Sequence, residues 1–246
     1  MIAFKDTYES RKKEIEEFIE LMKFLEKKEF SKKDDISEFS SFFYQGEDRI
    51  SLTYQSLINI LKSNVSLMIY NIIEYTITNL MDSIYDEIRI HGLTYVDVNE
   101  CIRALWRKNI LKSTNDPNAN FNTFLRKNEE IIDNIIDNVT LDIHSRSSLP
   151  AGNLDGISIR QTFESHGIMI STNSRNYRPD ILNSIKTQRN NLAHGSVSFT
   201  DAVRMDAISD IESNEKFVIS FLEELIETVI DYIDHEMYKV NSSKIV

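Results

Sequence analysis

Residues 51–90 read SLTYQSLINILKSNVSLMIYNIIEYTITNLMDSIYDEIRI. Apolar side chains fall on nearly every side of a helix built from this stretch, which is typical of a helix buried at the centre of a protein. They are Leu57, Leu61, Val65, Met68, Ile72, Ile73, Ile77, Leu80, Ile84 and Ile88. Glu74 ends an uncharged run of eleven residues that begins at Ser63, and such a run is too short to span a bilayer. The stretch predicts a long central helix and no membrane partner.

The rest of the composition agrees with a helical bundle. Only 6 Gly and 3 Pro occur in 246 residues, whereas a sheet protein of this size needs many tight turns. A hydrophobic content of 41% is enough for one sizeable core. The single cysteine, Cys101, excludes an internal disulfide framework and a cysteine-rich zinc site. The sequence therefore predicts an all-α fold and a single domain over residues 1–246.

Further helices are predicted outward from the central one. They cover 4–28, Thr94 to about Lys112, Phe124 to about Ile143, Ser158 to Gly167, Pro179 to His194, and about 205–239. Thr94 with Asp97, and Ser158 with Gln161, have the spacing of a helix start, and Gly195 stands where a helix ends. The polar stretch 29–50 carries aromatic residues that we expect to pack onto the core, namely Phe39, Phe42, Phe43 and Tyr44.

Charge is distributed unevenly along the chain. The net charge of −11 argues against indiscriminate binding to nucleic acid or to an anionic membrane. Residues 146–204 nevertheless hold seven bases and four acids, whereas residues 206–236 hold ten acids and one base. An anion should therefore bind through the first of these segments. The charged, amphipathic N-terminal stretch is unlike a secretory signal, so we expect a cytoplasmic protein.

One polar heptapeptide, RNNLAHG at 189–195, ends a predicted helix inside the basic segment. Arg189 lies seven residues after Leu182, along the apolar stripe, so it either snorkels from the core or faces a partner. Histidine can move protons near neutral pH, and arginine can neutralise a phosphate, as metal-free RNA cleavage requires. Five residues separate Arg189 from His194, about 140° on an ideal helix, so the two do not share one face.

The spacing alone is weak support for catalysis. Arg160 and His166 form a second pair of the same kind. The context of RNNLAHG differs, because an amide follows its arginine and a terminating glycine follows its histidine. From the residues alone, a polar helix end and a catalytic site both remain open.

Three segments resemble the HEPN superfamily (higher eukaryotes and prokaryotes nucleotide-binding domain). IKTQRNNLAHGSVSF at 185–199 is similar to the family's signature of an arginine, a polar residue and a histidine. SSLPAGNLDGISIRQTFESHGI at 147–168 and SLMIYNIIEYTITNLM at 66–81 resemble segments of one long bacterial branch. Together they cover about a fifth of the chain, and the helix order fits throughout.

The resemblance implies a fold and a site. The fold would be an all-α, HEPN-like bundle with a long central helix and added helices, with its motif-bearing part at about 145–240. Arg189 and His194 would be the catalytic pair and Asn190 the polar residue beside the arginine. Glu74 and Asn191 would be supporting residues. In active relatives two protomers place their motif helices face to face, which implies a homodimer or a pairing with a related HEPN chain.

Other candidates are weaker. Glu74 lies in the most apolar helix and must be paired, with Arg189 a suitable partner, or have an altered pKa. His166 precedes a glycine, as helix-end histidines do. Asp231 and His235 could bind a metal, but no third ligand is evident. No nucleotide-binding glycine motif is present, so we expect no metal and no cofactor.

Two functions follow from these observations. The first is a metal-independent endoribonuclease of the toxin or phage-defence kind, with RNA as substrate and room for a cognate antitoxin among its partners. The second is a non-catalytic HEPN interaction module, antitoxin-like or the scaffold partner of a nuclease. Its main support is the net charge of −11, because an acidic protein repels RNA at long range.

Overall fold

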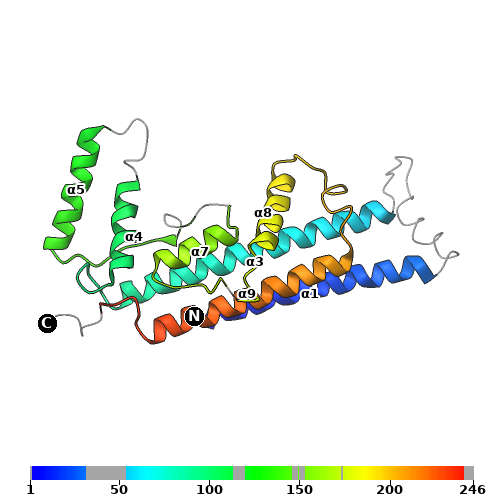
Figure 1. Ribbon diagram of the computed structural model, residues 1–246, viewed down its shortest axis with the longest axis horizontal. Helices are drawn as coiled ribbons and strands as arrows, with labels where there is room; N and C mark the ends of the chain where they lie inside the picture. Colours follow the sequence, from blue (N-terminus) through cyan, green and yellow to red (C-terminus); the bar gives the residue numbers. More distant parts are fainter. Residues whose placement is uncertain are drawn as a thin grey trace. The chain divides into compact units, whose positions relative to one another are not determined.

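The computed structural model describes residues 2–31, 54–112, 120–145, 149, 153–172 and 174–240. Within these ranges the protein is all-α, and its one piece of extended pairing is an isolated bridge between Val98 and Lys239. The helices are α1 (Ile2–Ser31), α3 (Tyr54–Ile90), α4 (Glu100–Leu111), α5 (Phe121–Ile136), α7 (Gly156–Ser165), α8 (Pro179–Ala193) and α9 (Ile208–Asp234) (Figure 1). The predicted fold class is confirmed.

Helix α3 is the long apolar helix expected from residues 51–90. Its side chains are buried along its whole length, from Ile58 and Val65 to Ile84 and Ile88. By length and composition alone the stretch 55–90 could also cross a membrane, yet 56% of its most apolar window is buried inside the protein. Burial of that extent is what a core helix shows. Each fully buried aliphatic side chain contributes about 1.5–3 kcal/mol to folding.

The chain divides into two compact units. The first comprises residues 1–73 and 180–220, and the second comprises residues 74–179 and 221–246. Both α3 and α9 contribute residues to each unit. The prediction of a single domain over 1–246 stays a prediction.

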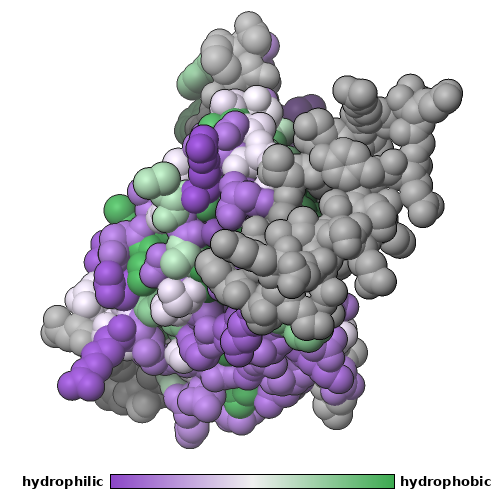
Figure 2. Space-filling model, turned by 90° about the vertical axis from the view of Figure 1, so that its right-hand side faces the viewer, coloured by the Kyte–Doolittle hydropathy of each residue, from purple (hydrophilic) through white to green (hydrophobic). Residues whose placement is uncertain are grey.

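In the first unit, α1 contacts α9 through a salt bridge of 2.8 Å between Lys23 and Glu212. Between α1 and α9 the buried faces are apolar, with Ile15 and Met22 on α1 and Ile211 and Val218 on α9. On the face of the protein in Figure 2, hydrophilic residues cover most of the coloured surface, and the hydrophobic ones are scattered. Scattered apolar residues are normal on a folded protein.

In the second unit, α3, α7 and α9 meet at a buried histidine. The Nε2 atom of His166 lies 2.6 Å from the hydroxyl of Tyr85 on α3. The backbone oxygen of His166 accepts a hydrogen bond from Tyr232 on α9 at 2.8 Å. His166 ends α7, and Gly167 follows with φ +82°, so the predicted helix-end histidine is confirmed.

Several predicted helix boundaries are wrong. α4 begins at Glu100 rather than at Thr94, because the side chain of Asn99 caps it by accepting from the amide of Ile102. The carboxylate of Asp97 instead accepts from the amide and the hydroxyl of Thr94, and this closes a turn before the helix. Such local side-chain bonds compete with helix formation.

Similar differences occur in three other helices. α5 starts at Phe121 with Asn120 as its cap, and it ends at Ile136 because Asn138 adopts a left-handed φ of 50°. α7 is capped by Asp155, whose carboxylate pairs with Ser158 in a capping box. α9 is shorter than predicted, running from 208 to 234. The aromatic residues of the polar stretch, Phe39, Phe42, Phe43 and Tyr44, lie outside the described residues.

Candidate functional site

The motif RNNLAHG closes α8, as the sequence predicts. Pro179 begins the helix and Gly195 follows its end with φ +67°. The amide of Ser196 donates to the oxygen of Asn191 at 2.9 Å, and the amide of Gly195 donates to Leu192 at 3.2 Å. This pair of bonds is a Schellman end, in which glycine adopts the left-handed conformation without strain. His194 therefore lies at the last, half-helical position of α8.

Arg189 lies against α3. Its guanidinium carbon is 4.9 Å from the ring centroid of Tyr70, which is fully buried, and its Nη1 donates to the side-chain oxygen of Asn190 at 3.0 Å. A cation over an aromatic face gains about 0.5–2 kcal/mol, more when water is excluded. The half-buried Arg189 is thus held in place, while guanidinium has five N–H donors in all. An arginine fixed in this way is suited to bind an oxyanion.

Tyr70 belongs to a buried polar stripe on α3. Asn59, Ser63, Ser66 and Tyr70 are spaced by four, three and four residues and share one face of the helix. Their exposed fractions are 4%, 0%, 4% and 0%. Polar groups buried this deeply need partners. Three of them find theirs in α8 or in the segment that follows the motif.

That segment is attached to α3 by side chains. The hydroxyl of Ser63 donates to the backbone oxygen of Phe199 at 2.7 Å, and the amide of Asn59 donates to that of Thr200 at 3.1 Å. The ammonium of the buried Lys62 donates to the backbone oxygen of Asp206 at 2.7 Å. These bonds hold the segment that follows His194 in the sequence against α3. Figure 1 shows α8 and this segment beside the first part of α3.

His194 is solvent-exposed, and its side chain makes no hydrogen bond within the described residues. Arg189 and His194 are not hydrogen-bonded to each other, which agrees with their separation of about 140° on a helix. One chain thus presents a fixed arginine and a free histidine on different sides of one helix end.

The two supporting candidates are less informative. Asn191 is half-buried and supplies the backbone oxygen that closes the helix end. Glu74 is half-buried on α3 and belongs to the second unit, whereas Arg189 belongs to the first. The predicted pairing of Glu74 with Arg189 stays a prediction.

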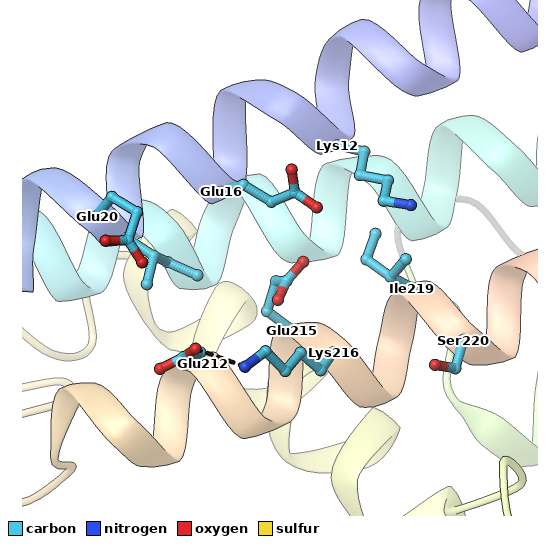
Figure 3. A pocket seen from close by; sticks show the side chains of 9 residues that line it. Lys12, Glu16, Glu20, Glu212, Glu215, Lys216, Ile219 and Ser220 are labelled. Atoms are coloured by element: carbon cyan, nitrogen blue, oxygen red, sulfur yellow. Dashed lines mark hydrogen bonds and ion pairs between the residues drawn. The ribbon is translucent and has the colours of Figure 1, made fainter.

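Away from the motif, the first unit has an acidic pocket of about 620 Å³ between α1 and α9 (Figure 3). Four carboxylates and two ammonium groups line it, from Glu16, Glu20, Glu212, Glu215, Lys12 and Lys216. Figure 3 shows the carboxylates of Glu16 and Glu215 turned toward one another. An excess of carboxylates repels phosphate, so this pocket does not suit RNA.

Within this pocket, the pKa values of two glutamates are shifted in opposite directions. Glu215 is only 4% exposed, and burial, reinforced by the charge of Glu16, raises its pKa. Glu212 is hydrogen-bonded to Lys216 and to Lys23, and these bonds lower its pKa to about 2. Burial therefore disfavours the charged form of Glu215, whereas the two lysines favour the charged form of Glu212.

No cluster of three or more metal-ligating side chains occurs among the described residues. Asp231 and His235 face each other at 3.0 Å, but as an exposed pair within one helical turn. His166 is fully buried and occupied on both ring nitrogens, by Tyr85 and by the backbone oxygen of Thr162. Burial lowers the pKa of His166 to about 4, so it is neutral near pH 7 and structural in role.

Sequence reasoning found the motif but missed the stripe on α3. The signal was present, because polar residues recur on one face of an otherwise apolar helix. Nothing local marks Tyr70 or Ser63 as partners of a segment more than a hundred residues later.

Comparison with known families bears on the same region. The model of the HEPN_MAE_28990-like HEPN family matches residues 3–238, which is nearly the whole chain. Neither a curated protein nor a solved structure matches the chain significantly. The match supports the resemblance that the motif and the helix order indicate.

Proposed function

The chain belongs to the HEPN_MAE_28990-like HEPN family, and on that premise we propose that it is a metal-independent endoribonuclease with a site around Arg189, Asn190 and His194. One observation carries the proposal. Arg189 is held over the buried ring of Tyr70 and by Asn190, five residues before an exposed histidine that has no hydrogen-bond partner in the described part of the chain. A fixed cation and a free proton carrier are the two groups that phosphate transesterification needs.

The reaction follows from these groups. The 2′-hydroxyl of a ribose attacks the adjacent phosphorus, and the bond from phosphorus to the 5′-oxygen breaks. The histidine takes the proton of the 2′-hydroxyl and then returns it to the leaving 5′-oxygen. Arginine neutralises the charge that builds on the phosphate oxygens. The products are a 2′,3′-cyclic phosphate and a 5′-hydroxyl, and no water or metal is consumed.

A second copy of the chain supplies what one copy lacks. Because Arg189 and His194 point about 140° apart, one helix end does not direct both to a single phosphate. A two-fold axis beside α8 brings the arginine of one protomer opposite the histidine of its partner. The assembly proposed for the nuclease is therefore a homodimer, or a pair with a related HEPN chain, formed through α8. RNA that bridges the two copies would strengthen this dimer by mass action.

Cleavage of RNA in EDTA tests the activity. His194→Ala should abolish cutting and the formation of cyclic phosphate ends, with little change in melting temperature because His194 is exposed. His235→Ala is the matched control, since His235 is also exposed and also directly follows the last residues of a helix. Loss of cutting in both variants, or in neither, would contradict the assignment.

Mixing two inactive variants tests the shared site. Arg189→Ala and His194→Ala chains, mixed in equal amounts, form mixed dimers in half of the cases, and each mixed dimer holds one complete site. Activity should therefore return to about a quarter of the wild-type value. A mixture as inactive as its components would show that each site lies within one chain.

A non-catalytic interaction module is the second candidate, favoured by the net charge of −11 and by the acidic pocket. Such a module would leave RNA intact at high protein concentration and form a stable complex with a second protein. Arg189→Ala would not affect that complex, whereas it would weaken salt-dependent RNA binding by a nuclease.

A further inference from the structure

Helix α5 exposes an unusual amount of apolar side chain. The exposed fraction is 70% for Phe121, 43% for Leu125, 54% for Ile132 and 69% for Ile136. Of the helix's own residues only Ile131 is buried. Single exposed apolar residues are common, but a helix that turns most of its large apolar side chains outward is not.

These four residues form a single stripe. They are separated by four, seven and four positions, so they fall within about 60° of one another on an ideal helix and span about 22 Å along it. With full side-chain areas of about 200 Å², their exposed fractions amount to roughly 500 Å² of apolar surface. That is the size of the largest patch on a typical monomer, and such patches are often functional. It is also most of the roughly 800 Å² that each partner buries in a standard interface.

We propose that α5 pairs with α5 of a second copy of this chain, antiparallel, through the stripe Phe121, Leu125, Ile132 and Ile136. The spacing is self-complementary. With the two-fold axis between residues 128 and 129, Phe121 lies opposite the partner's Ile136, and Leu125 lies opposite the partner's Ile132. Both pairs of numbers have the same sum, so one register satisfies both. Every apolar residue of the stripe then has an apolar partner.

Charged residues beside the stripe favour an antiparallel orientation of the two α5 helices. Arg126, Glu129 and Asp133 are exposed along one flank, with the base toward the N-terminal end and both acids after it. An antiparallel copy places its Arg126 opposite these carboxylates, which outweighs the approach of the two Glu129 side chains near the axis. A parallel copy would turn the two copies of this flank to opposite sides of the pair, so these charges would have no partners across it. Opposite charges across a helix pair set its orientation.

Asn128, in the middle of the stripe, is also compatible with pairing to a second copy. Asn128 interrupts the apolar residues at the position of the axis, and its side-chain nitrogen donates to the oxygen of Phe124 at 2.8 Å. Its side-chain oxygen remains to accept from the amide of the partner's Asn128. A single asparagine in the seam of a helix pair fixes register at some cost in stability.

A membrane surface is a poorer occupant of the stripe, because α5 carries two bases and three acids, whereas helices that bind anionic lipid are basic.

This pairing is independent of the one proposed for α8. Helix α5 contacts α4 in the second unit, and α8 lies in the first. Pairing through α5 would therefore give a dimer if α8 leaves the chain a monomer, and a tetramer or a longer chain of copies if α8 pairs as well. The ratio of masses reports on α5 whether or not the proposed nuclease is active.

Sedimentation velocity of the full chain at micromolar concentration tests the pairing. The variant Leu125→Glu/Ile132→Glu should have at most half the mass of the wild type and the same helical content by circular dichroism. Ile157→Glu is the matched control, since Ile157 is 55% exposed on α7 and lies outside the stripe, and its mass should equal the wild type's. An unchanged mass in the double variant would overturn the proposal. A lower melting temperature with that unchanged mass would show that the chain itself covers the stripe.

Disulfide trapping tests the direction. On a Cys101→Ser background, Leu125→Cys chains mixed with Ile132→Cys chains should form a mixed disulfide dimer under mild oxidation. Each variant alone should form little, because the two like positions lie apart in the antiparallel register. Dimers from each variant alone, in place of the mixed one, would show a parallel pair. Absence of any trapped dimer would refute pairing through α5.

Discussion

His166 should contribute to the loss of stability that the protein undergoes in acid. Its Nδ1 lies 2.7 Å from the backbone oxygen of Thr162, which only accepts, so the proton of the neutral ring is on Nδ1. Nε2 then accepts from the hydroxyl of Tyr85. A second proton on Nε2 would reverse that bond, so that the hydroxyl of Tyr85 accepts, and would place a charge in a fully buried site.

The magnitude follows from the two pKa values. Burial lowers the pKa of His166 from 6.5 to about 4 in the folded protein. Because the folded-state pKa is depressed, this contribution to stability is complete above pH 6.5 and is lost as pH falls through 4. The full loss is about 3 kcal/mol, of which about 2 kcal/mol is lost at pH 5. A loss of that size is a large share of the 5–15 kcal/mol that stabilises a typical domain.

Urea unfolding at pH 7 and at pH 5 measures the effect. His166→Gln keeps one donor and one acceptor but does not titrate, so the wild type should lose about 2 kcal/mol more than this variant between the two pH values. Other titrating groups cancel in the difference. His235→Gln, at an exposed histidine, should behave as the wild type does. Equal losses in the wild type and in His166→Gln would refute the argument.

Three further predictions concern the first unit. Glu215→Gln should raise the melting temperature at pH 7, because burial raises the pKa of Glu215, and the gain should shrink as pH falls toward 4.5; thermal scans at both pH values measure it, and a gain that grows in acid would contradict it. Gly195→Ala should cost about 1 kcal/mol by strain at φ +67°, since the added carbon meets nothing within 4 Å; Gly195→Asn should cost less, and equal losses in urea unfolding would count against strain. Ser63→Ala should cost about 1–2 kcal/mol by leaving the oxygen of Phe199 unpaired, and it should slow RNA cleavage without weakening dimer formation, as turnover and sedimentation would show.

The fold could be predicted where the pattern is long and its ends are chemically distinct. Residues 51–90 gave the central helix to within a few positions, and Pro179 and Gly195 gave both ends of α8. The start of α4 was missed because Thr94 and Asn99 are both residues that cap helices. Tertiary context decides between them, since Asn99 also donates to the backbone oxygen of Met237 at 2.8 Å. A local pattern contains no such information.

The sequence predicts the motif of the candidate site, but it does not predict the residues of α3 that hold the motif in place. Arg189 and His194 stand five residues apart in one segment, so sequence alone presents them together. Tyr70 contacts Arg189, and Ser63 contacts the segment after the motif, only when α3 packs against α8. In the sequence, the spacing of these polar residues on an otherwise apolar helix is the only sign of that contact. The exposed face of α5 is a related case. Periodicity shows that it is amphipathic, but not that its apolar side remains uncovered within one chain.

The position of the motif at a helix end explains why a second copy suits it. A motif inside a long helix would fix both side chains on its surface, about 140° apart, with helix continuing on both sides. At the end of α8, Gly195 turns the chain away with φ +67°, and His194 is exposed. Two such ends meeting at a two-fold axis gather two arginines and two helix C-termini. An RNA phosphate between the copies relieves the repulsion among the cations, so the substrate itself completes the charge balance of the proposed site.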